Sequence, residues 1–146
     1  MLRNILAVVV GIMIGSLVNI LLVNLGPLVV PLPEGADVTD MEKLRESMKL
    51  MKPANFLFPF LGHAIGTLVG AFLAAKIARS WKMGFAMVIG VFFLFGGFAA
   101  IKMLGGPMWF NVTDIALAYL PMGYLGGILA GGKNPSQSAM ELELTP

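Results

Sequence analysis

The sequence predicts an all-α membrane protein, a bundle of four transmembrane helices with a short amphipathic helix in the first loop. The first observation behind this prediction is composition: 58% of the 146 residues are hydrophobic and 12% are charged. A soluble domain carries about 25% charged residues, so the apolar surplus is too large for a water-soluble core. The second observation is that the apolar residues gather in four long segments.

A transmembrane helix needs about 20 mostly apolar residues. Four segments meet this length, and we expect spans at residues 5–25, 56–77, 83–101 and 115–132. None of them contains Asp, Glu or Arg, and Lys76 lies at a helix end from which it reaches the interface. The first run exceeds the roughly 7–15 residues of a signal-peptide core, so we interpret it as a retained span. The whole chain, residues 1–146, is expected to form one membrane domain.

The longest predicted loop covers residues 26–55 and should contain the amphipathic helix, at about residues 40–52. Thr39 and Glu42 have the spacing of a capping box, in which each side chain binds a free backbone N–H of the other residue. This helix is expected to lie on the membrane surface or to roof the bundle, with partner binding as the alternative. Residues 133–146 are predicted to be a flexible tail.

Glycines recur at every fourth position in three of the predicted spans, which places them on one helical face and favours close helix packing. The pattern does not distinguish packing within one chain from self-association. The residues concerned are Gly11 and Gly15 in the first span, Gly62, Gly66 and Gly70 in the second, and Gly123, Gly127 and Gly131 in the fourth.

The positions of glycine and proline also raise the question of an internal repeat. Gly-Pro pairs follow the first and third spans, and Pro59 and Pro121 lie early in the second and fourth. A duplicated two-helix hairpin would produce this arrangement. Coincidence is the favoured interpretation, because glycine and proline are common in membrane helices.

The positions of the Lys and Arg residues predict the orientation of the chain in the membrane. Five of them, Arg3, Lys76, Arg79, Lys82 and Lys133, would lie on one side, and five, Lys43, Arg45, Lys49, Lys52 and Lys102, on the other. We expect both termini in the cytoplasm, because the cations of the first set lie closest to helix ends.

Polar side chains inside the predicted spans are the candidates for a site. His63, Asn19 and Tyr119 should lie in the same leaflet, with Asp114 near its rim and Thr67 one turn from His63. The functional interpretation is a polar pocket for an ion, a proton or a small ligand. The structural interpretation, which we favour at this point, is that neutral His63 binds Asn19 or a backbone carbonyl and fixes the helix register.

Other classes of function find little support. The predicted spans contain no paired carboxylates, and the sequence has no catalytic triad pattern, phosphate loop or metal-ligand spacing, so no enzyme, cofactor or metal site is expected. The missing span carboxylate also counts against small multidrug-type exporters. The absence of cysteine excludes Cys-ligated metal, and no cluster of cations indicates nucleic acid binding. Eleven methionines leave copper handling as a weaker alternative, because they are not densely spaced.

Several stretches resemble a group of short, uncharacterised bacterial four-span membrane proteins. They are LRNILAVVVGIMIGSLVN, GPLVVPLPEGADVTDMEKLRESM, FPFLGHAIGTLVGAFLAAKIA and MWFNVTDIALAYLPMGYLGG. The resemblance implies a bacterial inner-membrane location and no catalytic activity. We therefore expect a non-enzymatic protein with the lipid bilayer as its surroundings, acting as an accessory or assembly component of a membrane complex or as a homo-oligomer. The alternative is a small transporter or channel with a polar site around His63.

Overall fold

The computed structural model describes residues 2–132, and this part of the chain is helical without a β-strand. Four of its helical segments are long and apolar enough to cross a membrane, which confirms the predicted fold class. The predicted tail, residues 133–146, and Lys133 lie outside the described residues. The elements are α1 (Leu2–Val29), α2 (Met41–Ser47), the 3₁₀ helix η1 (Pro53–Phe56), α3 (Leu57–Ile77), α4 (Lys82–Leu104), α5 (Met108–Leu117) and α6 (Leu120–Leu129).

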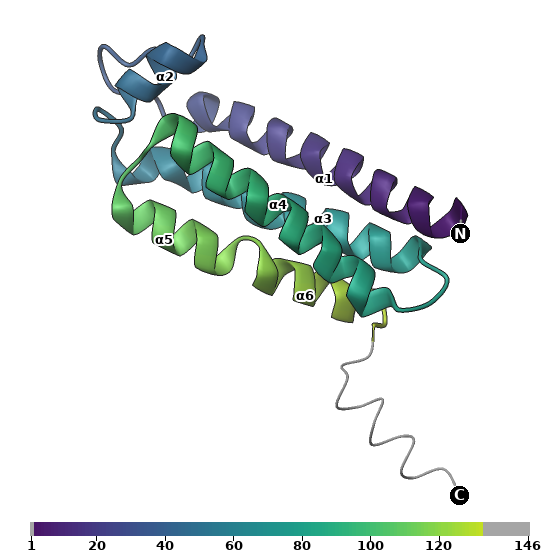
Figure 1. Cartoon of the computed structure of the whole chain (residues 1–146). Coiled ribbons are helices and arrows are strands. Elements are labelled where there is room, and N and C mark those ends of the chain that lie inside the picture. Colours follow the sequence, from purple (N-terminus) through teal and green to yellow (C-terminus); the bar gives the residue numbers. More distant parts are fainter. Residues whose placement is uncertain (1, 133–146) are drawn as a thin grey trace, which may run out of the picture.

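Helix α3 lies at the centre of the bundle, in contact with α1, α4 and α6, and α4 also packs against α6. Figure 1 shows the long helices side by side, with α1 along one edge. The start of α1 and the end of α6 lie at one end of the bundle, here called the terminal end (Figure 1). Helix α2 lies at the other end, here called the loop end.

Helices α1 and α3 approach each other closely where their glycines meet. A Cβ atom added to Gly66 would lie 2.7 Å from the carbonyl oxygen of Gly15, and one added to Gly15 would lie 2.7 Å from that of Gly66. Gly11 and Gly70 face each other in the same way, at 2.7 and 2.6 Å. Such distances leave no room for a side chain without movement of the backbone.

The glycines of α6 face two different helices, α4 and α3, and Gly131 lies in the turn that follows α6. A Cβ on Gly123 would lie 3.1 Å from Cα of Gly90 on α4, and one on Gly126 would lie 2.7 Å from the carbonyl oxygen of Leu68 on α3. Gly127 also faces α4. The prediction that Gly131 packs against a helix is wrong. It follows the end of α6, is exposed and has a φ of +80°, the left-handed conformation in which glycine commonly ends a helix.

The amphipathic helix is shorter than predicted. Helix α2 covers Met41–Ser47, and the segment predicted to continue it to residue 52 forms a turn before η1 begins. The N-cap is Asp40, which accepts a hydrogen bond from the backbone N–H of Lys43 at 2.9 Å. The capping role predicted for Thr39 is wrong, because its hydroxyl donates to Asp37 at 2.6 Å instead.

The fourth span differs most from the prediction of residues 115–132. It begins at Met108, directly after Pro107, so that Asp114 lies inside it rather than at its rim. It is also interrupted at Ala118 and Tyr119, between α5 and α6. Pro121 explains the interruption, since it has no N–H to donate to the carbonyl of Leu117 and its ring crowds that oxygen. The expectation that no span contains a carboxylate is therefore wrong.

Candidate ligand site between α3 and α5

Three polar side chains meet where the fourth span is interrupted. Nδ1 of His63, on α3, lies 2.9 Å from both carboxylate oxygens of Asp114, on α5. The hydroxyl of Tyr119 donates to Oδ2 of Asp114 at 2.7 Å. Asp114 and Tyr119 are only 3% and 2% exposed, so this contact takes place among apolar side chains. We call the three residues the polar cluster.

The interruption of the helix positions Tyr119 in this cluster. Its ring stacks on that of His63, with the centroids 5.7 Å apart. On another side the ring lies against Gly97 of α4, where an added Cβ would come within 2.5 Å of the tyrosine hydroxyl. Gly97 therefore provides the space that the phenol needs to reach Asp114.

Thr67 lies one turn along α3 and is 1% exposed. Its hydroxyl donates to the backbone carbonyl of His63 at 2.7 Å. Thr67 therefore satisfies its own polar atom within α3 and makes no hydrogen bond to the Asp114 carboxylate.

Asn19 does not join the polar cluster, so the expected hydrogen bond from His63 to Asn19 is wrong. The Asn19 side chain lies against Gly62, where an added Cβ would be 2.8 Å from its Oδ1. Successive helical residues point about 100° apart. Gly62 therefore faces α1 and Asn19, while His63 faces α5.

The polar cluster carries a charge that depends on His63. An ionised carboxylate accepts both hydrogen bonds, from the Tyr119 hydroxyl and from an Nδ1–H of His63. With Asp114 ionised, the cluster carries one negative charge beside a neutral imidazole and is neutral overall beside a protonated one. The site can thus hold a proton or balance one positive charge on a ligand.

A cavity of about 180 Å³ leads to the polar cluster, and we call it the inner cavity. His63 and Asp114 are the only titratable residues among those that line it. Its walls are otherwise mostly apolar and come from several helices and from the α2 segment. They include Val23, Leu44, Met48, Met51, Phe56, Ala100, Ile101, Leu104 and Phe110.

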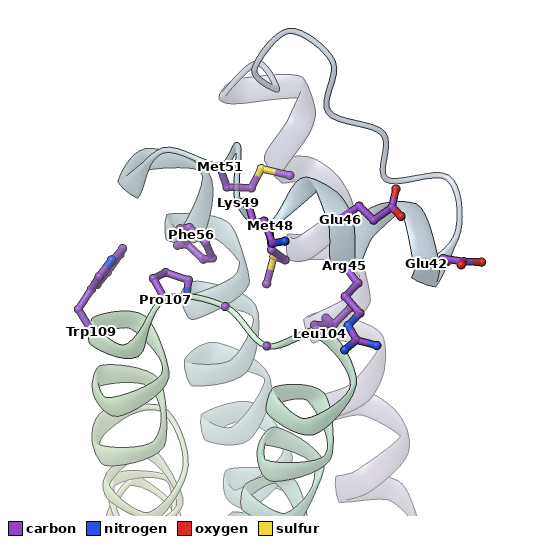
Figure 2. Close-up of a pocket in the computed structure, with 12 residues that line it drawn as sticks. Glu42, Arg45, Glu46, Met48, Lys49, Met51, Phe56, Leu104, Pro107 and Trp109 are labelled. Atoms are coloured by element: carbon purple, nitrogen blue, oxygen red, sulfur yellow. The ribbon is translucent and has the colours of Figure 1, made fainter.

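A second, larger cavity of about 660 Å³ lies at the loop end, and we call it the outer cavity. Figure 2 shows its walls, with Trp109, Pro107 and Phe56 on one side, Glu42 and Arg45 on the other, and Met48 between them. The two cavities share five lining residues, Met48, Met51, Phe56, Leu104 and Gly105. The outer cavity therefore borders the inner one, with the α2 segment as part of its wall.

The partnership of His63 with Asp114 was missed by sequence reasoning, which placed Asp114 at the rim. A local signal was present: Pro107 before Met108 is typical of a helix start, and it would have moved Asp114 into the span. Nothing in the sequence pattern indicated the cavities, because the walls of the inner one come from α1, the α2 segment, η1, α3, α4 and α5.

Comparisons with protein-family models, with curated proteins and with solved structures find no match for this chain. Within residues 2–132, no group of three or more His, Cys, Asp or Glu side chains is arranged to hold a metal ion.

Proposed function

We propose that the protein is a small transporter or channel whose intramembrane site is the polar cluster of His63, Asp114 and Tyr119. The observation that carries this proposal is the buried carboxylate of Asp114, bound to His63 at the base of a cavity that opens toward the loop end. Ionisable side chains inside membrane spans are costly, and they commonly mark the path of an ion, a proton or a substrate.

The structural interpretation of His63 explains less of what is observed. A register-fixing contact needs one hydrogen bond, and an amide or hydroxyl pair would supply it without burying a carboxylate. It also gives no reason for a cavity to end at the carboxylate. The interruption of the fourth span points the same way, since discontinuous helices in transporters occur at their binding sites.

Proton flux into proteoliposomes, followed with a trapped pH-sensitive dye, tests the proposal. We expect the wild-type protein to conduct protons, and Asp114→Asn and His63→Gln to lose this flux while they keep their melting temperatures. Thr113→Ala is the matched control, because Thr113 is the exposed neighbour of Asp114 on α5. Wild-type flux no greater than that of empty liposomes, or full flux in Asp114→Asn, would exclude the proposed role.

The second proposal is the accessory or assembly role in a membrane complex, or a homo-oligomer. It is supported by the outward face of α4, where Phe92, Phe95 and Phe98 are 48%, 70% and 47% exposed. Such a row suits contact with another membrane protein as well as with lipid. A stable partner, or a second copy, retained on purification in a gentle detergent would favour this role.

We also propose a bacterial inner-membrane location with both termini in the cytoplasm. The resemblance noted in the sequence supports the location. The orientation is supported by the terminal end, where Arg3, Lys76, Arg79 and Lys82 lie without any Asp or Glu among residues 2–132. Cations near helix ends favour the cytoplasmic side.

We further infer that the facing glycines hold α1 against α3. The support is the mutual approach of Gly15 and Gly66, and of Gly11 and Gly70, at which each glycine faces a backbone carbonyl of the other helix. Small residues permit such contacts in membranes, where helix association depends on van der Waals packing.

A further inference from the structure

We propose that the inner cavity binds a small organic cation, a protonated amine attached to an apolar body, with Asp114 as its counter-charge. The inference rests on the proposed function only in treating the polar cluster as a site. Its test measures binding and not flux, so that the two proposals can fail separately.

The charge of the cavity favours a cation. Among residues 2–132, Asp114 is the only acidic residue that lines it, and no Lys or Arg of this part of the chain does. With Asp114 ionised and His63 neutral, the cavity holds one negative charge. A bound anion would lie beside this carboxylate without a counter-charge, which is costly in apolar surroundings, whereas an ammonium group would balance it.

Asp114 also has capacity for a further donor. A carboxylate offers about four lone-pair sites. His63 and Tyr119 make three contacts with it, of which two fall on Oδ2 and one on Oδ1. One site thus remains on Oδ1, and it suits one of the three N–H donors of a primary ammonium group.

The walls of the inner cavity favour an organic cation over a metal ion. A hard cation such as Na⁺ or Ca²⁺ needs several oxygen ligands. Among residues 2–132, the side-chain oxygens that line the cavity belong to Asp114, Asn55 and Asn111, and Oδ1 of Asn55 already accepts from the backbone N–H of Lys52. Phe56, Phe110, Met48 and Ile101 instead offer apolar contact for an alkyl or aromatic body. Aromatic rings add attraction for a positive charge near their faces.

The outer cavity provides a route for such a ligand. Its lining combines the opposite charges of Glu42, Glu46, Arg45 and Lys49 with apolar side chains such as Met48 and Phe56. No single sign of charge dominates there, so the outer cavity does not exclude a cation. Selection by charge then takes place at Asp114.

Calorimetric titration of the purified full chain in detergent tests the inference, with hexylammonium, hexanol and hexanoate as probes of equal chain length. We expect hexylammonium to bind about tenfold more tightly than hexanol, which is the effect of one modest charge contact. Hexanoate should bind no more tightly than hexanol. In Asp114→Asn the preference for hexylammonium over hexanol should disappear.

Two further variants distinguish binding in the inner cavity from the effects of misfolding and from uptake of the probes by detergent micelles. Ala100 lines the inner cavity, so Ala100→Leu should fill it and abolish binding of hexylammonium and hexanol while Asp114 stays in place. Its neighbour Ala99 is exposed and does not line the cavity, so Ala99→Leu should bind as the wild type does.

Hexanoate binding as tight as hexylammonium, a preference that survives Asp114→Asn, or equal binding in the two leucine variants would each overturn the inference. Cation binding without proton flux in proteoliposomes would leave the inference intact and remove the transport proposal. Proton flux that depends on Asp114, together with no binding of hexylammonium, would overturn the inference and leave the transport proposal intact.

Discussion

At the scale of single residues, the buried polar side chains around Asp114 provide hydrogen-bond partners for one another or bind the backbone. Asp114 accepts from His63 and Tyr119, and Thr67 donates to the backbone of α3. No buried side-chain nitrogen or oxygen in the described part of the chain lacks a partner. Removing one member therefore leaves another without its hydrogen bond, and the cost depends on what replaces it.

Two substitutions of His63 should differ in stability. Gln keeps an N–H donor for Asp114, so we expect His63→Gln to melt close to the wild type. His63→Leu leaves the carboxylate with Tyr119 alone and should cost about 0.6–2 kcal/mol, the range for interhelical hydrogen bonds in membranes. The measurement is the free energy of unfolding in detergent. Equal losses in both variants would show that the bond to Asp114 does not contribute to stability.

A pH-dependent contact lies outside the membrane spans, at Asp37 in the first loop. Hydrogen bonds from the Thr39 side chain and backbone, with a contribution from Lys43, lower the pKa of Asp37 to about 2. Because this pKa lies below the unfolded value of 3.8, Asp37 stabilises the loop above about pH 4. That contribution is lost as the pH falls through about 2.

NMR titration of the Asp37 carboxyl group measures this effect directly. We expect Thr39→Val to raise the pKa toward its usual range, because the Thr39 hydroxyl makes the largest contribution. Lys43→Met should raise the pKa by less. A larger rise in the lysine variant would mean that the ion pair, at 3.0 Å, and not the hydroxyl, holds the carboxylate in its charged form.

At the scale of elements, two features position the site. The close contact of α1 with α3 sets which face of α3 turns toward α5, and the interruption at Ala118 and Tyr119 turns the phenol toward Asp114. Helix α2 lies at the loop end, where Ser47 exchanges hydrogen bonds with the backbone of Asp37 at 2.8 and 3.0 Å. The contact of α1 with α3 depends on their facing glycines, and the interruption of the fourth span depends on Pro121.

Two glycine-to-alanine substitutions test the contact of α1 with α3. A Cβ at Gly66 would meet the Gly15 carbonyl at 2.7 Å, whereas a Cβ at Gly96 of α4 has nothing within 4 Å. We expect Gly66→Ala to destabilise the protein by about 1–3 kcal/mol through overpacking. Gly96→Ala should be neutral or stabilising by up to about 1 kcal/mol, because alanine favours helix.

The melting temperatures of both alanine variants in detergent provide the measurement. If the melting temperature of Gly66→Ala equals or exceeds that of Gly96→Ala, α1 does not pack on α3 through Gly66. The close approach of the two backbones would then contribute nothing to stability.

At the scale of the whole molecule, the two ends of the bundle differ in chemistry. The terminal end uses its cations to cap helix carbonyls: Arg3 donates to the carbonyl of Ile77 at 2.6 Å, and Lys82 to that of Ala130 at 3.2 Å. Cations at helix C-termini are stabilised by the helix dipole. The loop end instead carries charges of both signs above the two cavities. The orientation therefore decides which compartment the loop end and its two cavities face.

Single cysteines test the orientation, since the sequence has none of its own. Ser80 lies at the terminal end and Met41 on α2, and both are exposed. We expect an impermeant maleimide to label Met41→Cys in intact spheroplasts and Ser80→Cys only after the membrane is opened. Labelling of Ser80→Cys in intact spheroplasts would reverse the orientation and place the cavities on the cytoplasmic side.

The sequence by itself determined the fold class, the existence of four apolar spans and the common level of His63 and Tyr119 along the bundle. These properties depend on hydropathy and on distance along a helix, which are local and can be read from one segment at a time. Only the tertiary structure decided that Asp114 is the partner of His63, that Asn19 faces Gly62 instead, and that a cavity ends at the carboxylate. The physical reason is that these contacts depend on the rotation of each helix about its axis. That rotation follows from the backbone contacts of α1 with α3 and from the interruption before Pro121, and neither can be derived from the average hydropathy of a span.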